Sequence, residues 1–437
     1  MIDYTIIILG GVTMSEKSLL IKHISQLVTP TGDSMRCGAQ MQEVKKIHDA
    51  AVFIENDTIR FVGTTAEVEQ SLSQAGIKAE TCMDAFGKCV LPGFIDSHTH
   101  FIFAGYRPDE FMMRLSGAAY LDIMKAGGGI AATVIPTREA SFETLYELGK
   151  NRLSMMLAQG ITTIEGKSGY GLDLDTELRQ LSVMKSLDEN EAMDIVPTYL
   201  GAHAVPQEAE STQSYVDFMI KEVLPEVKCK DLAKFCDVFC EEGVFSAEES
   251  ERLLSAAKEM GFDLKLHADE IHAIGGSEVA GKLHAVSADH LLHITDSGIQ
   301  ALRDNNVIAT LLPGTAFSLH APFAPARKII DAGCAVALAS DFNPGSCFIS
   351  SIPLTIALST IYMQMSLEET ITALTLNGAA ALGIAQKTGS IEPGKQADLT
   401  VLSYDNVNFL VYHTAANIVD TVIKKGKIVY ENNAPNA

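Results

Sequence analysis

The sequence predicts an α/β protein: a (β/α)8 TIM-like barrel with a small composite β-sandwich domain formed by the N- and C-terminal segments. Between about residues 90 and 385, short β-rich runs alternate with longer helical stretches, the pattern of a parallel sheet covered by helices. The β-rich runs number eight, the count at which a parallel sheet closes into a barrel with a filled interior. The flanks on either side of this region carry hairpin patterns instead.

The barrel strands and two of its helices can be located in chain order. Capping boxes, which satisfy free backbone groups at a helix start, pair Ser246 with Glu249 and Ser366 with Glu369. Gly261 can end the first of these helices. The eight predicted strands are Val90–Asp96, Thr162–Lys167, Ile195–Gly201, Cys236–Val244, Asp263–His267, Ala285–Asp289, Val307–Leu312 and Ala335–Ser340.

The two flanks are expected to form one domain together. Residues 49–63 have the pattern of two short strands around an Asn-Asp turn, and residues 397–431 contain the runs DLTVL and TVIKKGKIVY. Neither flank has enough strands to be stable alone, since an isolated hairpin is marginal in water. We therefore expect residues 1–89 and 389–437 to build the composite domain, with the barrel at 90–388 inserted between them.

Composition excludes several classes of function. The 437 residues include 33 Lys and Arg against 55 Asp and Glu, a formal net charge of −22. A nucleic-acid partner is not expected, because such proteins place Lys and Arg on phosphates, and an acidic surface repels anionic membranes. The longest apolar runs fall short of a membrane helix, and the N-terminal run Ile6 to Leu9 has no basic residue before it, so no secretory signal is expected. The eight cysteines include no CxxC pair, which favours free thiols and a cytoplasmic protein.

The strongest local signal is the stretch FIDSHTH, at the end of the first predicted barrel strand. Residues two apart on a strand point to the same side, so His98 and His100 are both expected to face the barrel axis at its carboxyl end. Two imidazoles that converge there make half of a metal site. Taken alone, an HxH pair is as readily two unrelated surface histidines.

Polar residues at the ends of other strands favour the metal site, because barrel enzymes place their chemistry at the carboxyl ends of the strands. Four strands are followed by or end in such residues: His203, His267, His290 and Asp341. Imidazole and carboxylate together suit zinc or iron(II), and a catalytic site leaves one position open for water. The predicted metal ligands are His98, His100, His267 and Asp341.

Longer motifs carry a family resemblance. The segments LPGFIDSHTH, HADE, SADH, ALASD and GSIEPGKQADLTVL resemble the metal-dependent amidohydrolase superfamily along essentially the whole chain. Narrower motifs, AGYRPDEF, KAGGGIAATV, IEGKSGYGLD and SDFNPGS, resemble its imidazolonepropionase family, which opens 4-imidazolone-5-propanoate to N-formimidoyl-L-glutamate in histidine degradation. Superfamily members with two metals bridge them through a carboxylated lysine on the fourth strand, where the run CDVFCEEGV offers none. The resemblance therefore implies one zinc or iron ion, a small-molecule substrate and a homodimer.

The resemblance also implies roles for individual residues. Arg107 would bind the propionate carboxylate of the substrate, which suits the fork of a guanidinium group. Glu270 and His290 are candidates for passing a proton to the departing ring nitrogen, and Asp341 for taking one from the attacking water. The positions that match substrate contacts are Arg107, Tyr170, His203, Glu270, Asn343, Gly345 and Ser346.

The same residues have plainer interpretations. Arg107 could be a solvated surface arginine, Tyr170 a barrel-rim aromatic and Glu270 a carboxylate favoured in the first turn of a helix. Residues 343–346 could be a simple β-turn. The loop at residues 101–140 is long enough to cover the site as a lid. No role is assigned to His272, His284, His293, His320 and His413, which lack a strand-end placement.

Two other functions compete with the hydrolase. A superfamily deaminase of a purine or pyrimidine ring would use a similar metal site, but Arg107 and Tyr170, which suit a carboxylate tail, count against it. A barrel that has lost catalysis and serves as a scaffold would not be expected to retain all four ligands. Ammonia release and the metal content of the purified protein distinguish these alternatives.

Overall fold

The computed structural model describes residues 18–117 and 129–432, so the segment before Met14 and part of the expected lid lie outside the described residues. Its centre is a parallel barrel with strand order β13-β12-β11-β10-β9-β8-β7-β6. The predicted eight-stranded barrel is therefore confirmed. Its strands are β6 (Phe94–Asp96), β7 (Ile161–Lys167), β8 (Asp194–Ala202), β9 (Phe235–Cys240), β10 (Asp263–Ala268), β11 (Ser287–His290), β12 (Ile308–Leu311) and β13 (Val336–Leu338).

The last and first strands meet just beyond their ends, and this seam closes the barrel. Thr99 forms a parallel bridge with Phe342. The backbone N–H of Asp341 donates to the carbonyl of His98 over 3.0 Å, and that of His100 donates to the carbonyl of Phe342 over 2.9 Å. Closure of the barrel thus sets the HxH pair beside Asp341, although more than 240 residues separate them in the chain.

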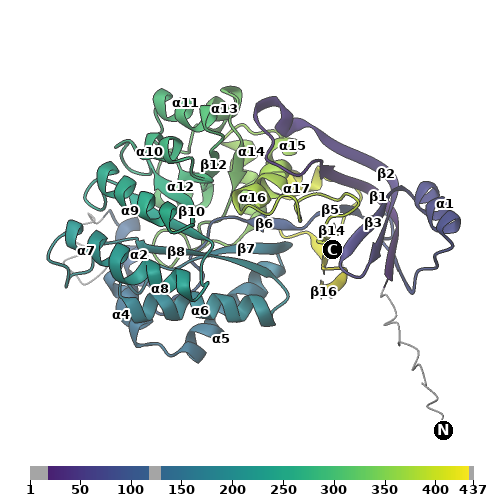
Figure 1. Ribbon diagram of the computed structural model, residues 1–437. Helices are drawn as coiled ribbons and strands as arrows, with labels where there is room; N and C mark the ends of the chain where they lie inside the picture. The colour runs from purple at the N-terminus through teal and green to yellow at the C-terminus, as the bar shows by residue number, and fades with distance from the viewer. Residues whose placement is uncertain (1–17, 118–128, 433–437) are drawn as a thin grey trace, which may run out of the picture.

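Helices surround the barrel, as Figure 1 shows. The two predicted capping boxes are confirmed: Ser246 Oγ accepts from the N–H of Glu249 over 3.2 Å, and Ser366 Oγ accepts from that of Glu369 over 3.1 Å. The helices of this region are α2 (Pro108–Leu115), α4 (Ala131–Glu139), α5 (Phe142–Leu157), α6 (Leu174–Asn190), α7 (Thr212–Phe218), the π-helix η2 (Met219–Val223), α8 (Leu224–Cys229), α9 (Ala247–Glu259), α10 (Gly276–Leu283), α11 (Asp296–Asp304), α12 (Pro313–Leu319), α13 (Ala326–Asp331), α14 (Ile352–Ile361), α15 (Leu367–Leu374) and α16 (Leu376–Ala381).

Both ends of the chain build the small domain, as expected. Figure 1 shows the purple N-terminal strands and the yellow C-terminal strands together beside the barrel. They form one connected mixed sheet of order β16-β15-β14-β5-β1-β2-β3, with β4 on β1. The sheet bends back on itself, because Thr58 of β3 forms a bridge with Gln396, just before β14. The strands are β1 (Ser18–Pro30), β2 (Val44–Glu55), β3 (Thr58–Thr64), β4 (Thr81–Asp84), β5 (Cys89–Pro92), β14 (Leu399–Leu402), β15 (Val419–Lys424) and β16 (Lys427–Glu431), and the short helices are η1 (Gly38–Gln42), α1 (Thr65–Ala75) and α17 (Phe409–Tyr412).

Two predicted strand boundaries are wrong. The expected single strand at 90–96 is two strands, because β5 pairs with β14 in the small sheet and β6 pairs with β7 in the barrel. The chain passes between the sheets at Gly93, where a Cβ would lie 2.3 Å from the side chain of Thr162. The expected strand at 236–244 ends at Cys240, since a turn follows in which Val244 N–H donates to the carbonyl of Glu241 over 3.1 Å.

An ion cluster joins the barrel to the small domain. Asp194, the first residue of β8, accepts from Lys424 Nζ over 3.0 Å, and its other carboxylate oxygen lies 2.6 Å from Lys425 Nζ. Lys424 also donates to Asp398 over 2.8 Å and is itself 2% exposed. The amino end of the barrel and β15 are thereby held together by charge as well as by packing. Among the described residues, no helix combines the length and the apolar character that crossing a membrane requires.

Candidate functional site

The four predicted metal ligands lie together at the carboxyl end of the barrel. Ligand atoms of His98, His100 and His267 lie within 4.8 Å of one another, and so do those of His98, His290 and Asp341. The Nε2 atoms of His98 and His100 are each 3.4 Å from Asp341 Oδ1. Two histidines come from the segment after β6, one from β10 and the aspartate from the segment after β13. Residues from three elements therefore converge on one point.

The chemistry of this group fits a metal ion. His98 Nε2 and His267 Nε2 are buried and have no hydrogen-bond partner among the described residues. A buried polar atom without a partner costs roughly 1–3 kcal/mol, so a cation that binds these nitrogens would relieve an existing cost. Asp341, with Thr315 Oγ1 donating to its Oδ2 over 2.5 Å, supplies the anionic ligand. The candidate ligands therefore combine imidazole nitrogens with a carboxylate oxygen.

The electrostatics around His98 also favour a positive charge there. Burial and the charge of Lys167 lower the pKa of His98, but the neighbouring carboxylates of Asp289 and Asp341 outweigh them and raise it to about 9. His98 Nδ1 lies 2.6 Å from Asp289 Oδ2 on the side away from Asp341. An imidazole flanked by two carboxylates sits where the protein stabilises a cation.

Charged residues below the histidines were missed in the sequence. Five of them are fully buried inside the barrel: Glu165, Lys167, Asp237, Lys265 and Asp289. A signal for them existed, because Glu165 and Lys167 stand two apart on β7, and Lys265 stands two before His267 on β10. Charges at alternate positions of a strand that is otherwise buried on both faces point into the barrel and need partners there.

Four residues with predicted catalytic or substrate roles surround the ligand group. The ring of His203 stacks on that of His100 with centroids 4.9 Å apart, and Tyr170 meets His203 edge-on at 5.2 Å. His290 Nε2 lies 3.5 Å from Glu270 Oε2, so the two candidate proton carriers face each other. Burial, and then the charges of Asp341 and Glu241, raise the pKa of Glu270 to about 8.

Arg107 lies against the loop that follows Asp341. Its Nε donates to the carbonyl of Pro344 over 3.3 Å, and its side chain is 9% exposed, which is less than a solvated surface arginine would be. The Asn343 side chain folds back on its own loop: its Oδ1 accepts from the N–H groups of Gly345 and Ser346, each over 2.8 Å. The loop is therefore a side-chain-stabilised turn that presents its backbone to Arg107.

Glu241, at the carboxyl end of β9, is a further residue that the sequence did not reveal. It is 2% exposed, and its oxygens accept from the N–H groups of Ile271 and His272 over 2.9 and 3.1 Å. His272 Nδ1 also lies 2.9 Å from Glu241 Oε1. These contacts fix the turn directly after Glu270, so Glu241 positions the candidate proton carrier without touching the ligand group.

Comparison with known proteins places the chain in a family. A family model described as the amidohydrolase family matches residues 89–429. The chain is 56% identical to an imidazolonepropionase of Parabacteroides distasonis over 418 residues, which covers 95% of this chain and 99% of that protein. It is 53% identical to an imidazolonepropionase of Clostridium tetani over 419 residues, which covers 96% and 99%. The chain belongs to the imidazolonepropionase family of amidohydrolases.

Solved structures share the fold of this imidazolonepropionase-family chain. An adenosine deaminase from Xanthomonas campestris with bound zinc has a TM-score of 0.68 at 19% identity and covers 94% of this chain and 92% of its own. A guanine deaminase from C. acetobutylicum has a TM-score of 0.67 at 15% identity and covers 95% and 100%. At these identities the likeness concerns the fold alone, so it does not favour deamination over hydrolysis. The amidohydrolase family and the His and Asp group together support a bound metal ion.

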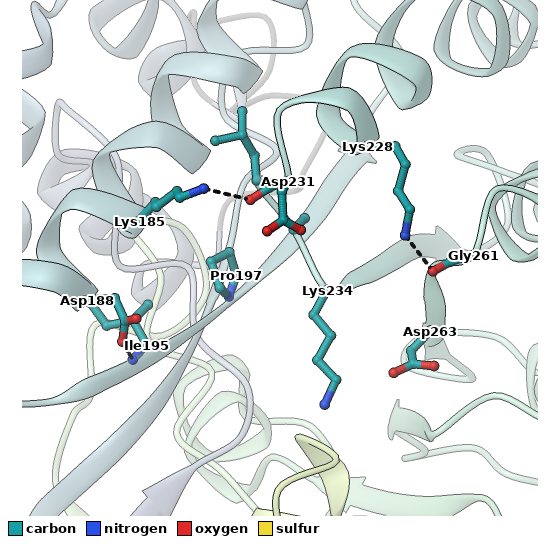
Figure 2. Close-up of a pocket in the computed structure, with 11 residues that line it drawn as sticks. Lys185, Asp188, Ile195, Pro197, Lys228, Asp231, Lys234, Gly261 and Asp263 are labelled. Carbon is teal, nitrogen blue, oxygen red and sulfur yellow. Dashed lines mark hydrogen bonds between the residues drawn. The ribbon is translucent and has the colours of Figure 1, made fainter.

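A separate cavity of about 400 Å³ lies at the opposite, amino end of the barrel strands. Figure 2 shows its lining, where Lys185 donates to the carbonyl of Asp231 over 3.2 Å and Lys228 to that of Gly261 over 2.8 Å. The lysines there are balanced by Asp188, Asp231 and Asp263 in the same lining. None of the predicted site residues lines this cavity.

Proposed function

We propose that the chain hydrolyses 4-imidazolone-5-propanoate to N-formimidoyl-L-glutamate, a ring-opening step of histidine degradation. The observation that carries this proposal is the convergence of His98, His100, His267 and Asp341 in a chain of this family. Arg107 and Glu270 beside that group supply the remaining functions that ring opening requires, which are binding of a carboxylate and delivery of a proton.

We infer that one zinc or iron ion is held by His98, His100, His267 and Asp341. When bound, such an ion supplies a water of lowered pKa and polarises the ring carbonyl. No lysine lies in β9, the fourth barrel strand, which supports a single ion in place of a bridged pair. The hydrolysed bond is the amide C–N bond of the ring: water adds a hydroxyl to the carbonyl carbon, and the ring nitrogen gains a proton.

The chain's own residues divide the proton transfers. Asp341 faces the reacting point with Oδ1, while Thr315 holds Oδ2, so Asp341 is placed to accept a proton from the attacking water. With a pKa raised to about 8, Glu270 holds a proton at neutral pH and can donate it to the departing nitrogen. Burial lowers the pKa of His290 well below its ordinary value, so its neutral ring, 3.5 Å from Glu270, can orient that carboxyl group.

The substrate is an anion, and the chain carries a net charge of −22, so the overall field opposes its approach. A local cation must therefore hold the propionate tail. Arg107 fits this role because its guanidinium is largely shielded from solvent and lies at the rim of the site beside Pro344. Tyr170 and the ring of His203 would contact the imidazolone ring, since both lie against His100.

A turnover assay on freshly generated imidazolonepropionate, with metal content measured on the same sample, tests this proposal. The expected result is loss of the imidazolone absorbance without ammonia release, from protein that contains a stoichiometric metal. Asp341→Asn should abolish turnover and leave the far-ultraviolet circular dichroism spectrum unchanged. Near-normal activity of that variant would overturn the assignment of Asp341. Ammonia release from purines or pyrimidines, without imidazolone hydrolysis, would favour the deaminase instead.

A further inference from the structure

Two lysines and three carboxylates form a buried ionic layer directly beneath the ligand group. Lys167 and Glu165 come from β7, Asp237 from β9, Lys265 from β10 and Asp289 from β11. All five side chains are fully buried. Burial of so many charges is costly unless each is paired, and residues from four strands meet here. Filling the barrel interior therefore does not explain this arrangement of paired charges.

Lys167 occupies the centre of this layer. Its Nζ lies 2.7 Å from Asp237 Oδ2, 3.0 Å from Glu165 Oε1 and 3.6 Å from Asp289 Oδ2. Burial by itself lowers the pKa of Lys167, but the charges of Asp237, Glu165 and Asp289 outweigh it and keep the ammonium group charged. One cation thus holds three carboxylates from three strands.

Two of those carboxylate oxygens also face the imidazoles of the ligand group. Asp289 Oδ2 lies 2.6 Å from His98 Nδ1. Asp237 Oδ2 lies 3.0 Å from His267 Nδ1. The oxygens that Lys167 contacts are therefore the same oxygens that meet the two histidines.

We propose that Lys167 is a positioning residue for the metal site: through Asp237 and Asp289 it fixes the orientation and tautomer of His267 and His98. A carboxylate behind Nδ1 keeps the proton on that nitrogen and leaves Nε2 free as the ligand atom. Without Lys167, the carboxylates of Asp237, Asp289 and Glu165 would repel one another in a closed space, and the two aspartates would turn away from the histidine rings. This inference rests on the proposed metal site.

A second metal ion in this layer is the main alternative, because atoms of His98, Glu165 and Asp289 also lie within 4.8 Å of one another. Lys167 already contacts both of these carboxylates, and Lys265 contacts Glu165. Lys265 Nζ lies 2.9 Å from Glu165 Oε2, and Thr198 Oγ1 donates to Glu165 Oε1 over 2.5 Å. With both oxygens of Glu165 engaged, the layer fits a support for the ligand group better than a site for another cation.

Lys265 provides a matched control on the same layer. It is as deeply buried as Lys167, but its Nζ contacts Glu165 and the carbonyl of Ser97, over 2.9 and 3.1 Å. Neither partner accepts a hydrogen bond from a predicted ligand. Replacement of either lysine by methionine removes one buried charge and keeps a similar length. Only Lys167→Met removes the cation that contacts Asp237 and Asp289.

The test is metal affinity, measured on metal-free full-length protein by competition for Zn²⁺ and Co²⁺ with a chromophoric chelator. We expect Lys167→Met to weaken binding by roughly 10- to 100-fold, the usual effect of disturbing groups behind a ligand, and to alter the visible spectrum of bound Co²⁺. Lys265→Met should change affinity by less than about 3-fold. Equal losses in both variants, or unchanged affinity in folded Lys167→Met, would overturn the inference.

Two further measurements keep the inference testable if Lys167→Met does not fold. The double variant Lys167→Met/Glu165→Gln removes one positive and one negative group, and it should show the same weakened affinity. In native Zn²⁺-loaded protein, nitrogen NMR of the histidine rings should find the proton on Nδ1 of His98 and His267; a proton on Nε2 of either ring would contradict the inference. Failure of native protein to bind any metal would instead refute the proposed metal site itself.

Discussion

Gly345 lies directly against the guanidinium of Arg107: a Cβ at position 345 would come within 1.8 Å of Arg107 Nη2. Only glycine leaves room for this approach, and the atom that would yield is the end of a flexible side chain. Gly345→Ala should therefore displace Arg107 and leave the fold intact. We expect KM for imidazolonepropionate to rise roughly 10-fold, with an unchanged thermal melting temperature. An unchanged KM would show that the substrate does not need Arg107 in its observed place.

Removal of the guanidinium itself should have a larger effect. Arg107→Ala would lose charge-assisted hydrogen bonds to the propionate tail, each of which contributes about 1.5–3 kcal/mol, so KM should rise at least about 10-fold. The control is an imidazolone analogue that lacks the carboxylate. Arg107→Ala and the native enzyme should bind this analogue with equal affinity. Equal losses for both compounds would mean that Arg107 does not bind the tail.

The protonation state of Glu270 predicts a basic limb in the pH profile. Its pKa is raised to about 8, mainly by burial, so the group is protonated below that value and loses its proton above it. If Glu270 donates a proton, kcat/KM should fall as pH rises through about 8. Glu270→Gln should reduce kcat by at least roughly 100-fold and remove this limb. A native profile that stays flat to pH 9.5 would count against Glu270 as the donor.

Glu241 should influence the rate without contacting substrate. In Glu241→Gln an amide N–H₂ would face one of the backbone N–H groups of Ile271 and His272, so the turn after Glu270 would shift. A displacement of about 1 Å in a catalytic group can cost roughly 100-fold in rate, and we expect kcat to fall while KM changes little. The neighbouring Glu242, whose side chain is 69% exposed, is the control, and Glu242→Gln should behave as native.

Asp194 should contribute stability that depends on pH. Burial by itself raises the pKa of Asp194, but Lys424, Lys425 and Gln396 outweigh it, and the pKa lies below its ordinary value. A pKa that is lower in the folded than in the unfolded state stabilises the fold at pH values above the unfolded pKa of about 4. This stabilisation is lost as the pH falls below that value.

Asp194→Asn should therefore lower the free energy of unfolding by roughly 1–3 kcal/mol at pH 7 and by less at pH 3, measured by urea denaturation. The control is Asp217, a surface residue that pairs with Arg252 and whose side chain is 35% exposed. Asp217→Asn should change the free energy of unfolding by less than about 1 kcal/mol. If Asp194→Asn lowered the free energy of unfolding equally at both pH values, the ionised carboxylate of Asp194 would not be the source of this stability.

The strands of the barrel were predictable because each is a short apolar run with clear limits, and the boundary errors have local causes. The strand at 90–96 divides because Gly93 must pass close to Thr162, a contact between segments that no local pattern encodes. The long strand β1 was missed altogether, because an irregularity between Ile21 and Ile24 interrupts its alternation of apolar and polar residues. The HxH pair and Asp341 were predictable because strand ends in such a barrel share one face.

The sequence by itself determined the barrel, the composite small domain and the four candidate ligands, because alternation, strand count and strand-end placement are local properties. Only the tertiary structure decided which buried charges support the candidate ligands. Lys167, Asp237 and Asp289 stand on three different strands, and their charges meet only when the barrel closes. A local pattern can indicate that a charge points inward, but it cannot say which partner it meets. That pairing depends on the register between strands, which the closed sheet alone sets.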